Sequence, residues 1–256
     1  MFLKRLLRRA PAEAPAPPAT VPPGTRVYAI GDVHGRLDLL DRLLTAIDAD
    51  DAARGPAETL LVFLGDLIDR GPDSAGVVAR AMALAASGRA VRFIKGNHEE
   101  VFLAALAGRE GTMRFFLRIG GEETLASYDI AGDEFRDADH DELTALAQAR
   151  VPEAHWAFLD GFEDQVEVGD YLFVHAGVRP GVPLAEQDPA DLRWIREPFL
   201  AHEGGHGRVI VHGHTIAPEV EERGNRIGID TGAYASDRLT ALGLEGGARW
   251  LLDTGD

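Results

Sequence analysis

The stretch LLVFLGDLIDRG at residues 60–71 decides the fold of this chain. Its first five residues are apolar and end at a glycine, which is the pattern of a short buried strand. Asp66 follows that glycine directly, and the pair Asp69 and Arg70 comes three residues later. Functional sites in layered α/β proteins gather just beyond the carboxyl ends of strands. The stretch therefore predicts a strand that ends in a functional loop.

Four further apolar runs end in the same way, each in side chains that can bind a metal. They are Val27–Ile30 before Gly31-Asp32-Val33-His34-Gly35, Val91–Ile94 before Lys95-Gly96-Asn97-His98-Glu99, Tyr171–Val174 before His175-Ala176-Gly177, and Val209–Val211 before His212-Gly213-His214-Thr215. Asp, His and Asn delivered from five strand ends favour a site for two metal ions. Oxygen and nitrogen ligands without thiolate suit Mn²⁺, Fe or Zn²⁺ better than a soft metal.

Composition excludes several classes of protein. The chain has 256 residues, of which 45% are hydrophobic and 27% charged, so one substantial core is expected. A formal net charge of −16 argues against a nucleic-acid partner, because such proteins need a basic face. The absence of cysteine excludes disulfides and thiolate chemistry, which fits a cytoplasmic protein. The sequence gives no indication of the oligomeric state.

The order of the elements predicts the fold class. Helical spacing over Arg36–Ile47, Ala75–Ala86 and Glu99–Ala107 follows the first three motifs, which is the pattern of a parallel sheet covered by helices. Short strands dominate after Glu163, and Gly246-Gly247 between two of them indicates a hairpin. We expect two sheets packed face to face, with helices outside and the site at one end.

Two segments stand apart from this pattern. Residues 1–23 are basic and then rich in Pro and Ala, which predicts a disordered tail before a domain at 24–256. The alternative for residues 1–9 is a weak membrane-surface helix, since apolar and basic residues alternate at helical spacing there. A helical insertion at about 109–160 is predicted to form a cap that shapes substrate access. The alternative is a peripheral helix cluster without substrate contact.

The motif set resembles the phosphoprotein phosphatase family of calcineurin-like metallophosphoesterases, and its bacterial and phage branch in particular. The resemblance runs from about residue 26 to 252. It implies a four-layer αββα sandwich with two mixed β-sheets and a dinuclear centre that contains Mn²⁺ or Fe, of which we expect Mn²⁺. By position, Asp32, His34 and Asp66 would hold one metal. Asp66, Asn97, His175 and His214 would hold the other.

The same resemblance assigns the remaining roles. Two metals roughly 3.5–4 Å apart can hold a bridging hydroxide that attacks phosphorus in line. His98 would be the general acid that protonates the leaving oxygen, and Asp69 the carboxylate that orients it. Arg70 would grip phosphate oxygens with its planar fork, and Asn97 lies where it can also reach substrate.

A second phosphate-binding arginine is expected between the last two histidine motifs. Arg196 fits the phage-type pattern Trp-x-Arg-Glu, and Arg193 is the competing candidate. His212 is expected to lie behind the ligands or to face solvent. Asp230-Thr231-Gly232 matches a segment of the bacterial members, and Glu99 is expected in the first turn of a helix.

The substrate remains open between two classes at this point. Asp69, Glu99 and His214-Thr215 match the protein phosphatase branch, so a Ser/Thr (and also Tyr) phosphoprotein or phosphopeptide is the leading expectation. Symmetrical diadenosine tetraphosphatases share most of the scaffold, but their second motif tends to read Gly-Asp-x-x-Ala-Arg-Gly. A third possibility is a binding protein that keeps the metals without turnover. The presence of both His98 and Asp69 argues against that third class.

Overall fold

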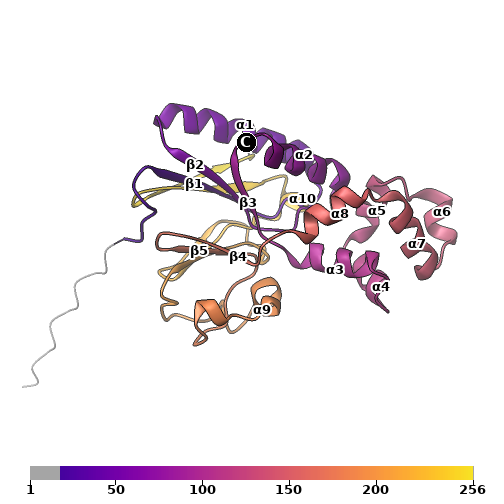
Figure 1. Cartoon of the computed structure of the whole chain (residues 1–256). Helices are drawn as coiled ribbons and strands as arrows, with labels where there is room; N and C mark the ends of the chain where they lie inside the picture. The colour runs from indigo at the N-terminus through magenta and orange to yellow at the C-terminus, as the bar shows by residue number, and fades with distance from the viewer. Residues whose placement is uncertain (1–17, 256) are drawn as a thin grey trace, which may run out of the picture.

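Two five-stranded sheets form the centre of the computed structural model, which describes residues 18–255 (Figure 1). The first sheet has the order β10-β9-β1-β2-β3 and the second the order β4-β5-β6-β8-β7. Their bounds are β1 Thr25–Ile30, β2 Glu58–Phe63, β3 Ala90–Phe93, β4 Gln165–Val168, β5 Tyr171–Val174, β6 Val209–His212, β7 Glu221–Glu222, β8 Arg226–Gly228, β9 Thr240–Glu245 and β10 Ala248–Asp253. All five predicted motif strands are confirmed.

Strand register brings the motifs to one edge. β1, β2 and β3 run parallel, and Ile30, Phe63 and Phe93 lie opposite one another at their carboxyl ends. In the second sheet β5 and β6 are parallel, with Phe173 opposite Val211. Both sheets are mixed, because β9 runs antiparallel to β1 and β4 runs antiparallel to β5. The loops that follow the five motif strands therefore leave both sheets at their carboxyl ends.

Alternation along β1 shows how the layers pack. Val27 and Ala29 face the second sheet and join its Phe173 and Val211 in one buried cluster. Tyr28 and its alternate neighbours on β1 belong to the cluster under the helices on the opposite face. Each Val or Leu buried in this way contributes about 1.5–3 kcal/mol relative to exposure.

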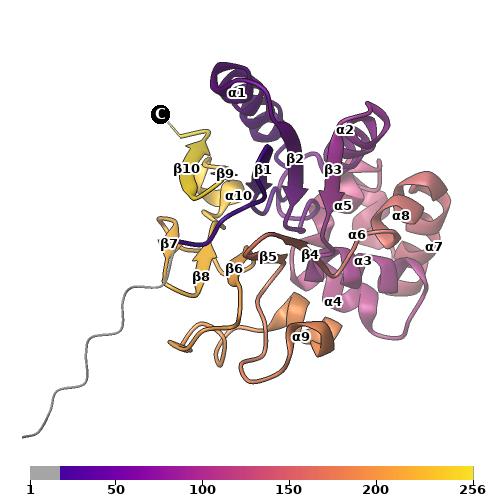
Figure 2. The ribbon, with the colours of Figure 1, turned by 60° about the vertical axis from the view of Figure 1, so that its left-hand side comes forward.

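Helices cover both outer faces and one end (Figures 1 and 2). The bounds are α1 Leu37–Arg54, α2 Ser74–Ala86, α3 Asn97–Leu106, α4 Thr112–Arg118, α5 Gly121–Ser127, α6 Gly132–Asp137, α7 His140–Arg150, α8 Glu153–Asp160, η1 Leu184–Glu186, α9 Pro189–Trp194 and α10 Ala233–Ser236. α1 and α2 lie on the first sheet, and α9 lies on the second, where Leu192 packs with Leu172 and Val174. This is the four-layer αββα arrangement.

Five helices, α4 to α8, occupy the predicted cap region and lie beside α3 at one end of the sandwich (Figure 2). Their apolar side chains continue the cluster under α1 and α2, so the cap shares a core with the first sheet. No helix in the described range of 18–255 has the length and apolarity needed to cross a membrane.

The amino-terminal boundary of the domain differs from the prediction. Val21 is buried and donates its backbone N–H to the Gly246 oxygen at 3.0 Å. Thr20 donates its N–H to an Asp170 carboxylate oxygen at 2.9 Å. These contacts tie the segment to both sheets, so the packed chain includes residues that we assigned to the tail. The predicted membrane-surface helix at residues 1–9 lies outside the described residues.

Candidate metal centre

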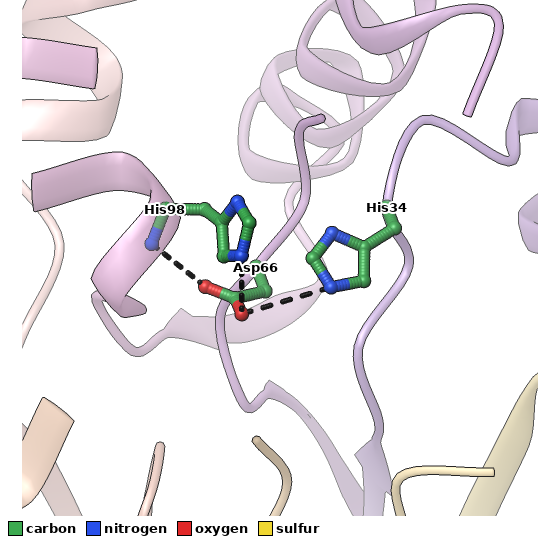
Figure 3. Close-up of side chains that lie close together, drawn as sticks. All are labelled: His34, Asp66 and His98. Atoms are coloured by element: carbon green, nitrogen blue, oxygen red, sulfur yellow. Dashed lines mark hydrogen bonds and ion pairs between the residues drawn. The ribbon is translucent and has the colours of Figure 1, made fainter. Parts of the chain in front are cut away.

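The carboxylate of Asp66 is the centre of the site. It lies at the end of β2, is 2% exposed, and has three imidazole nitrogens around a single oxygen. Its Oδ2 is 3.3 Å from Nε2 of His175, 3.7 Å from Nε2 of His34 and 3.8 Å from Nε2 of His98. Figure 3 shows this oxygen between His34 and His98, while the other oxygen accepts the His98 backbone N–H.

Two groups of buried side chains around Asp66 have metal-ligand geometry. One contains His34 and His98 with Asp66, and the other contains His175 and His214 with Asp66. Asn97 completes the second group, since its Oδ1 lies 2.9 Å from His175 Nε2 and 2.8 Å from His214 Nδ1. The structure therefore brings together the four residues predicted for the second metal, with Asp66 shared between the two groups.

The protonation pattern of these groups fits a cation. Nδ1 of His34 and of His175 each donates to a backbone carbonyl at 2.8 Å, so each Nε2 carries a lone pair when the ring is neutral. The lone pair of His175 faces the oxygens of Asp66 and Asn97, so acceptors meet acceptors there. That of His34 lies 3.7 Å from Oδ2 of Asp66 and 3.0 Å from the guanidinium of Arg70. Within residues 18–255, Nε2 of His214 is buried without a hydrogen-bond partner. Divalent cations would satisfy all of these atoms at once.

Electrostatics supports the same conclusion. Burial lowers the pKa of His34 to about 3 and that of His214 to about 2, so both rings are neutral and available as ligands. Burial alone would lower the pKa of His175 too, but the carboxylates of Asp66 and Asp32 outweigh it and raise the value to about 10. A proton on His175 thus takes the place of a cation, and metal binding would release it.

Asp32 is the predicted ligand that the geometry does not place in either group. It is buried, and its two oxygens accept the backbone N–H of His214 at 3.0 and 3.3 Å. Burial and the nearby Asp230 raise the pKa of Asp32 well above its usual range. The structure brings His98 to the first group instead, so a metal-ligand role for Asp32 stays a prediction.

Two motif glycines leave room for the carboxylates. A Cβ at Gly96 would lie 2.1 Å from Oδ1 of Asp66, and a Cβ at Gly213 would lie 2.0 Å from Oδ1 of Asp32. Any side chain at either position would displace a carboxylate from the site.

Glu99 has a larger role than the sequence indicated. It is fully buried, and its carboxylate accepts the N–H groups of Asp66 at 2.9 Å, Leu67 at 2.7 Å and Gly96 at 2.9 Å. Burial, followed by the charge of Asp66, raises the pKa of Glu99 to about 7. Glu99 therefore ties the first turn of α3 to the loop that carries Asp66.

The backbone at the site is held in a conformation that costs free energy. Five site residues that are not glycine have φ between 46° and 73°, namely His34, Asp66, Asp69, Arg70 and His214. Such left-handed conformations cost about 1–3 kcal/mol each and persist only where the surroundings enforce them. Their concentration here marks this loop cluster as a functional site.

His98 and Asp69 form the predicted acid pair. Nδ1 of His98 lies 2.6 Å from Oδ2 of Asp69, and both side chains are buried. Burial would lower the pKa of His98, but the carboxylates of Asp66 and Asp69 outweigh it and raise the pKa. The two carboxylates therefore favour the protonated form that acid catalysis requires.

The cap contributes a residue to this pair that the sequence did not reveal. Thr124 of α5 donates its hydroxyl to Oδ1 of Asp69 at 2.6 Å, and its Oγ1 lies 2.9 Å from the hydroxyl of Ser74. All three side chains are fully buried. Nothing marks Thr124 in the sequence, because it lies 55 residues from Asp69 inside the cap.

Arg70 also contacts the cap. Its backbone N–H donates to the Gly120 oxygen at 2.9 Å, and its Nε to the Ile119 oxygen at 3.4 Å. The guanidinium reaches His34 and His98 at 3.0 Å each. Tyr234 of α10, also missed by the sequence analysis, lies below the guanidinium at 4.9 Å. The cap is thus in direct contact with the site, whereas its effect on substrate access stays a prediction.

The two candidate arginines after His175 differ in their surroundings. Arg193 is held by ion pairs with Asp164 and with Glu100, the latter at 3.6 Å. Arg196 is exposed, and its charge lies near enough to His214 to lower the pKa of that ring further, after burial. The arrangement favours Arg196 as the arginine available for phosphate.

His212 lies away from the ligand groups. It is 1% exposed, its Nδ1 donates to the Gly213 oxygen at 3.0 Å, and its ring meets Phe199 edge-on at 5.0 Å. Burial lowers the pKa of His212 to about 4. Of its two expected positions, the one behind the ligands agrees with the structure and the solvent-facing one does not. Asp230 is likewise buried, and it accepts the Gly232 N–H at 2.9 Å.

This geometry defines a metal-dependent hydrolase, and the chain belongs to the calcineurin-like phosphoesterase family, whose sequence model matches residues 25–244. Members of this family use a dinuclear divalent metal centre. The chain is therefore a metallophosphoesterase.

Curated relatives divide between two substrates. The chain is 31% identical to serine/threonine-protein phosphatase 1 of Salmonella typhimurium, over 86% of this chain and 92% of that protein. It is 28% identical to an asymmetrical bis(5'-nucleosyl)-tetraphosphatase of Anoxybacillus flavithermus, over 83% and 88% respectively. A symmetrical bis(5'-nucleosyl)-tetraphosphatase of an Acidovorax species is 33% identical over 70% of this chain, which spans about half (49%) of that relative.

Solved structures agree on the fold. A candidate diadenosine tetraphosphatase superposes with a TM-score of 0.65 at 22% identity, covering 93% of this chain and 99% of that one. A cold-active protein tyrosine phosphatase gives a TM-score of 0.57, also at 22% identity, covering 91% and 81%. At these identities the likeness shows the fold alone.

The acid pair yields a prediction for the pH dependence of turnover. Asp69→Asn removes a charge that raises the pKa of His98, so the imidazole loses its proton at a lower pH. The alkaline limb of kcat should therefore move to lower pH, and kcat should fall by part of the roughly 10²–10⁴-fold contribution of a general acid. A pH–rate profile with a phosphomonoester measures both effects.

Thr124 supplies the matched variants for this profile. Thr124→Val loses the hydrogen bond that orients Asp69 and should lower kcat by less than Asp69→Asn does, while Thr124→Ser should retain the wild-type profile. An unshifted limb in Asp69→Asn would remove His98 from the role of acid.

Arg196 and Arg193 form a second test. Arg196→Ala should raise KM and lower kcat, because it removes a guanidinium that is available to the phosphate, while Arg193→Ala should leave both constants close to wild type. Steady-state kinetics on the two variants gives the answer. A loss confined to Arg193→Ala would exchange the two assignments.

Proposed function

We propose that this protein is a protein phosphatase that hydrolyses phosphate monoesters of Ser and Thr, and also of Tyr. The observation that carries the proposal is the buried His98–Asp69 pair, with its 2.6 Å hydrogen bond, at the edge of the metal centre. The relative from Salmonella typhimurium, which matches over most of both chains, supports the same class.

The leaving group explains why this pair favours monoesters of alcohols. A serine or threonine side chain leaves as a strongly basic alkoxide unless a general acid protonates it. A nucleotide leaving from a polyphosphate is a much weaker base and gains far less from a proton. A histidine held protonated by a buried carboxylate therefore suits the first reaction better than the second.

The other residues bind and orient the phosphate. Arg70 points both terminal nitrogens of its guanidinium, Nη1 and Nη2, into the site. Arg196 lies exposed near His214. Bound divalent ions, for which we propose Mn²⁺ because of the mixed oxygen and nitrogen ligands, would activate water and neutralise phosphate charge. His98 then holds the proton at Nε2 for the leaving oxygen, while Asp69 fixes its Nδ1.

A dinucleoside polyphosphate is the second candidate substrate. Several relatives carry the name bis(5'-nucleosyl)-tetraphosphatase. A groove of about 490 Å³ between α3 and α8 is lined by Trp156 and Leu103, and Glu100 at its edge accepts the Trp194 N–H at 2.9 Å. The indole of Trp156, which lines this groove, is suited to stacking on a nucleoside base.

A competition assay tests the choice between these substrates. Mn²⁺-loaded protein is given a phosphoserine peptide and diadenosine tetraphosphate together, and the products are resolved by chromatography. The proposal predicts that inorganic phosphate is released from the peptide in preference to any nucleotide product.

The His98→Asn variant is the control for chemistry at this site. It should lose about 10²–10⁴-fold in rate on the peptide, because the leaving alkoxide then receives no proton. Preferential formation by the wild-type protein of ADP, or of ATP and AMP, would assign it to the nucleotide hydrolases.

A further inference from the structure

We propose that the substrate is held at a second point by a basic aromatic rim, which consists of Phe115 and Arg118 of the cap and Trp194 and Arg196 at α9. The Arg118 end of this rim would bind a second anionic group of the substrate, next to the phosphate that is hydrolysed and that Arg196 contacts. Where the substrate is a phosphopeptide, this inference rests on the proposed function above.

A chain of ring contacts connects the rim to the metal centre. The Trp194 ring meets His214 edge-on at 6.5 Å, and the Phe115 ring lies 6.1 Å from the Trp194 ring. The guanidinium of Arg118 then lies 5.7 Å from the centre of the Phe115 ring. These side chains form a continuous surface that begins at a metal-ligand candidate and ends at a cation.

The backbone places the rim beside the phosphate-binding arginine as well. Arg118 directly precedes Ile119 and Gly120, whose carbonyl oxygens accept hydrogen bonds from the side chain and backbone of Arg70. The segment that carries Arg118 is therefore fixed to the site at a second place, independently of the aromatic contacts.

Charge is a further feature of this surface. The chain has 42 acidic and 26 basic residues, and most of its arginines make ion pairs, Arg193 among them. Arg118 and Arg196 are exposed, and neither makes an ion pair within residues 18–255. The overall acidic charge of the chain disfavours acidic phosphopeptides at long range. These two cations place positive charge at the edge of the site.

Arg118 has a structural explanation that the test must separate from binding. It lies in the last turn of α4, where a cation favours the helix dipole. That effect would change thermal stability and leave substrate preference unaffected. Arg114, one turn earlier on α4, is the matched control. It lines a different groove, with His140 and Asp141 of α7.

The second anion can come from two sources with the same chemistry. One is the carboxylate of an acidic residue beside the phosphorylated residue of a peptide. The other is a distal phosphate of a dinucleoside polyphosphate. A charge-assisted contact with an arginine serves either one.

The experiment compares substrates with and without this anion on Mn²⁺-loaded wild-type, Arg118→Ala, Arg118→Lys and Arg114→Ala proteins. The substrates are a phosphothreonine peptide flanked by Glu, the same peptide flanked by Gln, diadenosine tetraphosphate and p-nitrophenyl phosphate. We expect the wild type to prefer the Glu peptide in kcat/KM. Arg118→Ala should reduce that preference roughly three- to fivefold, as for an exposed ion pair, and added salt should reduce it too. Arg118→Lys should restore it, and Arg114→Ala should retain it.

The outcomes separate the two proposals. Two ratios of kcat/KM decide the proposal: the Glu peptide over the Gln peptide, and diadenosine tetraphosphate over p-nitrophenyl phosphate. If both ratios are the same in wild type and in Arg118→Ala, the proposed role of the rim is wrong. Hydrolysis of diadenosine tetraphosphate but of neither peptide would overturn the proposed function. In that case the rim is supported if Arg118→Ala lowers kcat/KM for the dinucleotide relative to p-nitrophenyl phosphate, and overturned if that ratio is unchanged.

Discussion

The structure depends on one buried carboxylate that faces three imidazole rings. Taking a charge such as that of Asp66 out of water costs several kcal/mol, and the cost is offset only when the site supplies opposite charge and hydrogen bonds. Backbone N–H groups and Glu99 fix the loop around Asp66, and the facing lone pairs of the histidines leave space that suits cations. Assembling this cluster also explains the left-handed backbone of the motif loops. It explains why Gly96 and Gly213 stand where a side chain would collide with a carboxylate.

The cap is part of the catalytic unit and not a separate covering. Thr124 donates a hydrogen bond to Asp69, and the Gly120 and Ile119 oxygens accept hydrogen bonds from Arg70, so the proposed acid pair and the proposed phosphate-binding arginine both contact the inserted segment. Insertions of this kind usually vary more than the scaffold that carries them. If the proposed roles of Asp69 and of the rim hold, a change in the cap would alter both turnover and substrate choice.

The sequence predicted the sandwich and most of the site because the motifs are local. Each strand end and its polar residues are adjacent in the chain, and parallel register then brings them to one edge without further information. Contacts between distant segments could not be predicted in the same way. Thr124 and Tyr234 reach the site only through tertiary packing, and Glu99 resembled an ordinary helix-cap acid until its burial and three backbone partners were seen. The amino-terminal boundary of the domain was predicted too late in the chain for a related reason. Val21 is a lone buried apolar side chain within a Pro-rich run, and nothing local marks it as part of the core.

The central claim is that Asp66 is shared by two metal ions, and calorimetric titration of metal-stripped protein with Mn²⁺ tests it most directly. The account predicts two ions per chain and proton release on binding. Asp66→Asn should lose tight binding of both ions, while the exposed control Asp41→Asn should bind like wild type. Binding of one ion or none by the wild type, or two tight ions in Asp66→Asn, would contradict the account.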